Sequence, residues 1–218
     1  MLNLTNDELL STTRAVRKRL DFDKPVEMDV IKQCVELAMQ APSGSNSQSW
    51  RFLLLTDVDK KRQIANLYRK AFAVYREGPT APTQQHKDDP SMAKTQQRVL
   101  ESAAYLAENL ERAPVWLIPC MNGRFDAPGM ATRAAAMFGS VIPAAWSFML
   151  AARARGLGTC WTTLHLGFEK ESAQILGIPY DNTTQVALIP IAYTKGTDFK
   201  PAARKPLESF LYINSWPL

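Results

Sequence analysis

Residues Met130–Arg155, which read MATRAAAMFGSVIPAAWSFMLAARAR, form the longest apolar stretch of the chain. Their composition favours one long helix, and from Phe138 onward almost every side chain is apolar. A helix that is apolar all round is buried on every side. In a chain of 218 residues, a second subunit is a candidate to cover one of those sides. Pro143 is expected to kink this helix or to mark the junction of two helices.

Outward from this stretch, short strands alternate with helices. Residues Thr5–Glu8 form a capping-box pattern, and the apolar spacing after it predicts an opening helix that reaches Leu20. Further helices are expected at 28–40, 60–75, 92–110 and 169–176, strands at 51–56, 113–121, 159–164 and 185–194, and exposed loops at 77–91 and 122–129. This order predicts a single domain over residues 1–218, of the α+β or the α/β class, in which helices flank a mixed sheet.

Composition narrows the class of protein. The formal net charge is +5, and the basic residues form neither a tail nor a repeat, which disfavours a nucleic-acid binder. Three cysteines without short spacing argue against a disulfide framework and a zinc site, so we expect reduced thiols. No secretory signal and no uncharged apolar run of about 18 residues is evident. We therefore expect a cytoplasmic protein that binds no membrane.

A basic cluster lies on the expected opening helix. It consists of Arg14, Arg17, Lys18 and Arg19. Residues three and four apart share one side of a helix, and a guanidinium matches the oxygens of a phosphate. Taken alone, the cluster is more simply explained as a solvated basic face.

Three further segments are rich in groups that bind ligands. Residues 42–50, PSGSNSQSW, bring hydroxyls, amides and free backbone N–H groups into one turn, although such residues dominate ordinary turns. Residues 156–164, GLGTCWTTL, contain two glycines that permit close approach to the backbone, or that simply end a helix. Residues 203–207, ARKPL, form a basic bend near the C-terminus.

Other kinds of chemistry find little support. His86 and His165 are isolated, Cys160 is expected to be buried and inert, and no catalytic triad can be assembled. The chain contains neither GxGxxG after a strand nor GxxxxGK[ST], so a Rossmann or P-loop nucleotide site is disfavoured. No metal site is expected.

Together, and in this order, four segments resemble the motifs of the nitroreductase family of flavoproteins. Residues 13–17 are similar to RRSVR, residues 41–50 to APSGxNxQPW, residues 156–161 to GLGTCW and residues 204–207 to RKPL. The chain departs from these motifs at Thr13, Ala15 and Ser49. It also resembles a chain with an insertion after Arg17, which gives Arg19 room to share in binding a phosphate.

The resemblance implies a fold, a cofactor and an assembly. The fold is a mixed β-sheet flanked by helices, in an intertwined homodimer with FMN at the interface. The chain would then have a variable lid-like segment at about 60–110 and a C-terminal arm at about 195–218. Arg14, Arg17 and Arg204 would bind the phosphate, and Ala15 would also contact the cofactor. The ribityl chain or the ring would be bound by Pro42, Ser43, Ser45 and Asn46. The reactive face of the ring would be lined by Thr162, Thr163 and Leu164.

The resemblance also implies a reaction. NADH or NADPH would reduce the flavin by hydride transfer, and a nitroaromatic, quinone or similar conjugated acceptor would then take the electrons in a ping-pong scheme. The flavin supplies the chemistry, so no catalytic side chain is needed. Alternatives are a specialised relative, such as a reductive dehalogenase or a flavin-fragmenting enzyme, and a non-enzymatic flavin-binding module.

Overall fold

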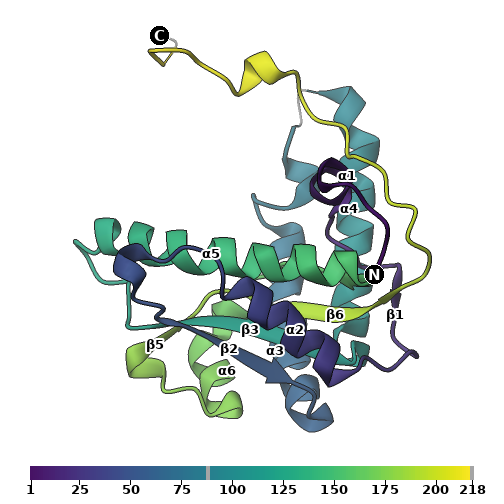
Figure 1. The fold of residues 1–218 in the computed structure, drawn as a ribbon. Coiled ribbons are helices and arrows are strands. Elements are labelled where there is room, and N and C mark those ends of the chain that lie inside the picture. Colours follow the sequence, from purple (N-terminus) through teal and green to yellow (C-terminus); the bar gives the residue numbers. More distant parts are fainter. Residues whose placement is uncertain (87–88, 217–218) are drawn as a thin grey trace.

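The computed structural model describes residues 1–86 and 89–216, so residues 87 and 88 of the expected loop and the last two residues of the expected arm lie outside it. Six helices and six strands follow one another along the described residues (Figure 1). The helices are α1 (Asn6–Thr12), α2 (Met28–Ala38), α3 (Val58–Glu77), α4 (Pro90–Asn109), α5 (Ala131–Ala154) and α6 (Glu169–Leu176). The strands are β1 (Leu20–Asp21), β2 (Trp50–Leu55), β3 (Val115–Asn122), β4 (Leu157–Thr159), β5 (Thr183–Gln185) and β6 (Ile189–Thr194).

All six strands belong to one sheet. The central path runs β1-β6-β3-β2, while β4 pairs with β6 and β5 pairs with β3. The ladders between these strands are antiparallel, and an isolated parallel bridge joins Ala15 to Thr159. The sheet is therefore mixed and flanked by helices, which confirms the expected fold class.

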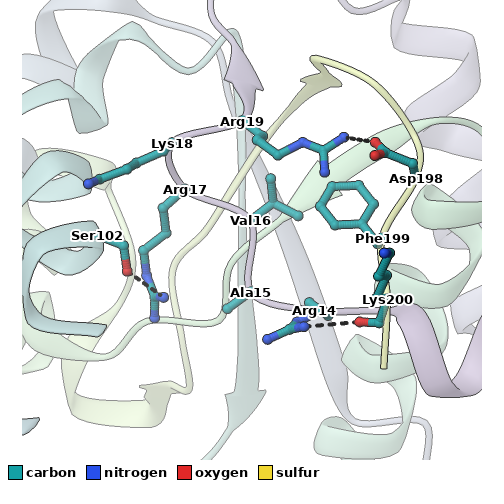
Figure 2. A pocket seen from close by; sticks show the side chains of 10 residues that line it. All are labelled: Arg14, Ala15, Val16, Arg17, Lys18, Arg19, Ser102, Asp198, Phe199 and Lys200. Atoms are coloured by element: carbon teal, nitrogen blue, oxygen red, sulfur yellow. Dashed lines mark hydrogen bonds and ion pairs between the residues drawn. The ribbon is translucent and has the colours of Figure 1, made fainter. Parts of the chain in front are cut away.

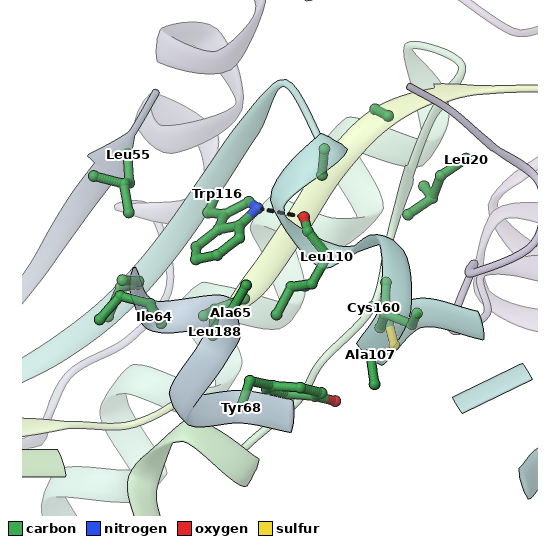
Figure 3. Close-up of a cluster of buried hydrophobic side chains, with 14 of the residues drawn as sticks. Leu20, Leu55, Ile64, Ala65, Tyr68, Ala107, Leu110, Trp116, Cys160 and Leu188 are labelled. Carbon is green, nitrogen blue, oxygen red and sulfur yellow. Dashed lines mark hydrogen bonds between the residues drawn. The ribbon is translucent and has the colours of Figure 1, made fainter. Parts of the chain in front are cut away.

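The sheet separates two apolar cores because side chains alternate between its faces along each strand. On β3, Trp116 and Ile118 face a core with α3 and α4, whereas Val115 and Leu117 face a core with α2 and α5. Figure 3 shows part of the first core, where Trp116 donates a hydrogen bond from its indole to the carbonyl of Leu110. Both faces are covered, which is why β3 is buried along nearly its whole length.

Helix α5 crosses one face of the sheet beside α2 (Figure 1). It runs unbroken through Pro143, so the alternative of two helices joined at this proline is wrong. By length and composition α5 could cross a membrane, yet its second half packs on α2 and the sheet through Ala145, Phe148 and Ala152. The opposite side is exposed at Ile142 and Trp146, so the expectation of burial all round holds for only one side within this chain.

The expected opening helix is wrong beyond Thr12. The capping box is confirmed, with Thr5 and Glu8 bonded reciprocally, but the backbone of Thr13 is extended. The hydroxyls of Ser11, Thr12 and Thr13 each donate to the carbonyl four residues earlier, which weakens a helix at this point. Beyond it, the amide of Val16 donates to the carbonyl of Thr159 at 2.8 Å, so residues 15 and 16 pair with β4 instead.

Two expected strands differ from those observed. The run at 159–164 is represented by β4, which begins and ends earlier, and by a single bridge between Thr162 and Leu188. The run at 185–194 is divided into β5 and β6, because Val186 donates to Pro119 and Leu188 pairs with Thr162. The remaining expected helices and strands are confirmed, with ends that shift by a few residues.

We predict that His165 makes stability depend on pH. Its side chain is fully buried without hydrogen-bond partners in the described structure, and burial lowers its pKa to about 4. The unfolded chain, with an imidazole pKa near 6.5, binds the proton more readily, so the folded state loses stability as pH falls from about 6.5 towards 4. Between pH 7.5 and pH 5 this histidine should account for a loss of about 2 kcal/mol in urea unfolding.

The matched variants are His165→Leu, which should lose that share of the pH dependence, and His86→Gln in the exposed loop, which should retain it. Equal pH dependence in the wild type and His165→Leu would contradict the prediction.

We predict that Gly158 allows residues 16–20 to lie against β4. A Cβ atom at this position would lie 2.7 Å from Thr194 and 3.0 Å from both Val16 and Leu20. Gly158→Ala should therefore lower the free energy of unfolding by about 1–3 kcal/mol. Gly167→Ala, whose Cβ would meet only Ala71 at 4.0 Å, is the control and should change stability by about 0.5 kcal/mol or less. Equal unfolding midpoints for the two variants would exclude this role.

Candidate functional site

A cavity of about 310 Å³ lies between residues 14–19 and residues 198–200, and Ser102 of α4 completes its wall (Figure 2). Two segments far apart in the sequence form most of it. Arg14, Ala15 and Arg17 of the first motif all line this cavity, together with Lys18 and Arg19. The structure thus keeps the basic cluster together although it does not lie on a helix.

The two segments are joined by direct contacts. Arg19 donates from Nε to the carbonyl of Lys195, pairs with the carboxylate of Asp198, and stacks on the ring of Phe199 at 4.2 Å. Arg14 donates to the carbonyl of Lys200 at 3.0 Å. These contacts give Arg19 a carboxylate partner and tie the basic segment to residues 195–199.

The charge of the cavity is strongly positive. Lys18 lies 4.0 Å from Glu101, a long pair between side chains that are about half exposed. Within the described residues, no carboxylate pairs with Arg14 or Arg17. Two guanidinium groups and Lys200 therefore remain available to an anion in this cavity.

A second cavity, of about 190 Å³, lies beside the first and shares Arg17 with it. It is lined by three residues that the sequence predicts to share one site, Thr162, Thr163 and Leu164. Tyr68 and Tyr75 of α3 line it as well. Arg17 reaches α4 by donating from Nη1 to the hydroxyl of Ser102 at 3.3 Å. Arg17 is therefore the residue that connects the cationic cavity with the aromatic one.

The walls of the second cavity carry neutral polar groups. The hydroxyl of Thr162 donates to that of Tyr68 at 2.8 Å, and burial raises the pKa of Tyr68 to about 12. Burial also raises the pKa of the Cys160 thiol, so the thiol stays protonated at neutral pH, consistent with an inert cysteine. The cavity thus offers hydrogen bonds and aromatic surface without a titrating nucleophile.

The loop that contains Pro42, Ser43, Ser45 and Asn46 lies elsewhere. Its Gly44 amide donates to the hydroxyl of Ser140 on α5, whereas Arg153 near the other end of α5 bonds to Thr12, close to the cationic cavity. The helical rise between residues 140 and 153 is on the order of 20 Å. These four residues therefore do not join the two cavities within one chain.

The loop nevertheless has an unusual backbone. Ser45, Asn46 and Gln48 all have positive φ values, between 46° and 53°. Non-glycine residues adopt this region at an energetic cost, and several together favour a loop shaped for a purpose. The side chains of Ser45, Asn46 and Gln48 are exposed in the single chain.

Arg204 is also separate from the cavities. Its guanidinium donates only to the carbonyl of the neighbouring Ala203 among the described residues, and it lies on the arm that leaves the body of the domain (Figure 1). Within one chain, Arg204 therefore does not lie with Arg14 and Arg17, with which it was expected to bind a phosphate.

Sequence reasoning missed Tyr68, Ser102 and Lys200 as cavity residues. Tyr68 and Ser102 lie on the long helices α3 and α4, where no motif marked them. Lys200 could have been noticed as a cation close to the last motif. Among the described residues, no group of three or more His, Cys, Asp or Glu side chains could hold a metal.

Comparison with known proteins identifies the family. Residues 10–193 match the model of the Nitroreductase family. The putative NAD(P)H nitroreductase YodC of Bacillus subtilis is 25% identical over 98% of this chain and 100% of its own length. The nitrobenzene nitroreductase of Ectopseudomonas oleovorans is 28% identical over 73% of this chain and 75% of its own.

Solved structures show the same fold. The crystal structure of oxidized iodotyrosine deiodinase bound to FMN and 3-iodo-L-tyrosine superposes with a TM-score of 0.71, at 21% identity, over 96% of this chain and 99% of that one. The family match begins within α1, ahead of the basic segment, and ends within β6. The chain therefore belongs to the Nitroreductase family.

Proposed function

We propose that this protein is an FMN-dependent oxidoreductase that uses NADH or NADPH to reduce nitroaromatics, quinones or similar conjugated acceptors, and that it works as a homodimer. The observation that carries the proposal is the pair of adjacent cavities joined by Arg17, one cationic and one aromatic. Family membership supports an oxidoreductase, and a structural relative is described with bound FMN.

The first cavity fits the phosphate of FMN. A phosphate carries about two negative charges and several acceptor oxygens. Arg14, Arg17 and Lys200 supply cationic donors, while the carboxylate of Asp198 in the same cavity pairs with Arg19. The exposed position of Arg14 and Lys200 lets the phosphate enter from solvent. Ala15 contributes backbone and a small side chain, which leaves room at the centre of the segment.

The second cavity fits part of a planar heterocycle. Trp161, Thr162, Thr163 and Leu164 form one side of it, and the tyrosines of α3 form another. A flavin has an apolar ring face and polar edges, and this wall offers both kinds of contact. Because Arg17 lines both cavities, a molecule with a phosphate at one end and a ring at the other would be held at both ends.

FMN, when bound, supplies the redox chemistry by accepting two electrons from NAD(P)H and passing them to the acceptor. The chain's own residues would bind the phosphate, place hydrogen bonds at the ring edge and leave one face of the site accessible. This division of tasks between FMN and the chain explains why no nucleophile or acid–base pair is found among the residues that line the second cavity. NAD(P)H and the acceptor would use the accessible face in turn.

The dimer is supported by apolar surface on α5. Ala135, Gly139, Ile142 and Trp146 recur every three or four residues and are all exposed. Such spacing places them on one side of the helix. A continuous exposed apolar face on a long helix is typical of a protein–protein interface, and a two-fold axis would pair it with its own copy.

The C-terminal arm supports the same assembly. It carries six large apolar side chains that are between 39% and 79% exposed: Leu207, Phe210, Leu211, Tyr212, Ile213 and Trp216. The arm leaves the body of its own domain (Figure 1), and a second copy is the partner we propose for it. In that assembly the partner would also bring its Ser43, Ser45, Asn46 and Arg204 to the cavities described above, which a single chain cannot do.

A second candidate function is reductive dehalogenation. It is favoured by the similarity to iodotyrosine deiodinase, whose structure covers nearly the whole of this chain, and by a 60-residue match that is 37% identical to the rat enzyme. The two candidates share FMN and differ in the acceptor. Rapid NAD(P)H oxidation with quinones favours the first, and turnover restricted to halogenated phenols favours the second.

The central test is reconstitution with FMN followed by anaerobic addition of NADPH or NADH. We expect the purified protein to bind FMN and the flavin absorbance to bleach, then to recover when a quinone is added. Arg17→Gln should raise the dissociation constant for FMN about tenfold or more, because it removes a charge-assisted hydrogen bond. Arg98→Gln, which removes an exposed guanidinium of α4 that lines neither cavity, is the matched control and should change it by less than about threefold.

The alternatives give distinct results. Protein that binds no FMN would exclude a flavoenzyme. Bound FMN that neither nicotinamide reduces would indicate a flavin-binding module without this activity.

We predict that Trp146→Asp converts the dimer to monomers, because it places a carboxylate at the centre of the proposed interface. The variant should also lose most of its affinity for FMN if the partner completes the site. Val74→Asp is the control, since Val74 is a 76% exposed apolar residue on α3 outside the proposed interface. Size-exclusion chromatography with light scattering measures the mass, and a monomeric wild type at micromolar concentration would contradict the dimer.

A further inference from the structure

Tyr68 stands where the apolar core meets the second cavity. Its ring packs among the buried residues on the α3 side of the sheet, and the whole residue is only 3% exposed. Figure 3 shows the ring beside Leu188 and Ala65, with the hydroxyl oxygen on the side away from Ile64. The same residue lines the cavity with Arg17 and Thr163. The ring therefore anchors the hydroxyl at the margin of the binding space.

Thr162 holds that hydroxyl in place. Its backbone is fixed by two hydrogen bonds with Leu188, one in each direction, at 3.1 and 2.8 Å. Its side-chain hydroxyl donates to the phenolic oxygen of Tyr68 at 2.8 Å. A rigid donor on one side of the phenol restricts the directions in which the phenol's own hydrogen can point.

The phenol hydrogen has no acceptor in the described part of the chain, since the bond from Thr162 uses the phenol as the acceptor. A buried O–H group without an acceptor is costly, whereas one that lines a cavity can donate to a bound ligand. Resting on the proposed function, we infer that Tyr68 is a hydrogen-bond donor to the FMN ring edge, oriented by the hydroxyl of Thr162.

The phenol is suited to donate rather than to exchange protons. Burial raises its pKa to about 12, so the hydroxyl remains protonated throughout the neutral range. Reduction of a flavin increases the negative charge on the polar edge of its ring, and a donor binds a charged acceptor more strongly than a neutral one. Tyr68 should therefore stabilise reduced FMN more than oxidised FMN, and thereby raise the reduction potential of the bound flavin.

Tyr68→Phe, which removes only the hydroxyl, tests this inference. We expect the dissociation constant for oxidised FMN to rise about fivefold, the value of one neutral hydrogen bond. The dissociation constant for reduced FMN should rise by a larger factor, so that the reduction potential falls. The affinity is measured by quenching of FMN fluorescence and the potential by equilibration with a reference dye under anaerobic conditions, neither of which depends on turnover.

Tyr105→Phe is the matched control. Tyr105 lies on the neighbouring helix α4, stacks on Phe22, and lines neither cavity. It should leave both the affinity and the potential unchanged. If Tyr68→Phe alone fails to fold, the double variant Tyr68→Phe/Thr162→Val removes donor and acceptor together, leaves no buried hydroxyl unpaired, and is expected to show the same fall in potential.

The outcomes separate this inference from the proposed function. Wild type that binds FMN, with an unchanged potential in Tyr68→Phe, would show that the hydroxyl serves only the core and would overturn the inference alone. Wild type that binds no FMN would overturn the proposed function and the inference with it. A fall in potential in Tyr68→Phe but not in Tyr105→Phe supports the inference.

Discussion

The hydrogen bond from the Val16 amide to the Thr159 carbonyl is the contact on which the candidate site depends. It holds Ala15 and Val16 along β4, ahead of a turn at residues 17–20, and the absence of a side chain at Gly158 permits the close approach. In a helix, Arg14 and Arg17 would lie on one side, one turn apart. In the observed structure, Arg17 lies where the chain turns and lines both cavities, while Arg14 bonds to Lys200.

Much of the fold could be predicted from the sequence because its signals are local. The capping box at Thr5, the apolar run of α5 and the buried strand β3 depend on neighbouring residues alone. The opening helix was wrong beyond Thr12 for the opposite reason. Its apolar spacing is helical, but the pairing of Val16 with Thr159, about 140 residues later, decides the conformation. No local pattern reports such a contact.

The residues of the candidate site also fall into two groups, those that local motifs predict and those that depend on the packing of distant segments. Motif resemblance pointed to Arg14, Ala15, Arg17 and Thr162–Leu164, and the structure brings these residues to adjoining cavities. Tyr68 and Ser102 escaped notice because their positions follow from how α3 and α4 pack on the sheet. Ser43 and Arg204 lie apart from the cavities within one chain. In the proposed dimer, a second copy would dock on the exposed faces of α5 and of the arm and supply these residues.

The connection between β2 and β3 has a consequence for how this chain can diverge. These strands pair along six residue positions and are joined by α3, α4 and the segment between them. The sheet fixes where this connection begins and ends. Within it, Tyr68 of α3 and Ser102 of α4 form hydrogen bonds with the cavity residues Thr162 and Arg17. Changes of length or sequence at the exposed residues 83–86, between α3 and α4, would leave the sheet in register. Small insertions and deletions there can therefore change the surface of this chain, while the cavity walls, including Tyr75 of α3, stay as they are.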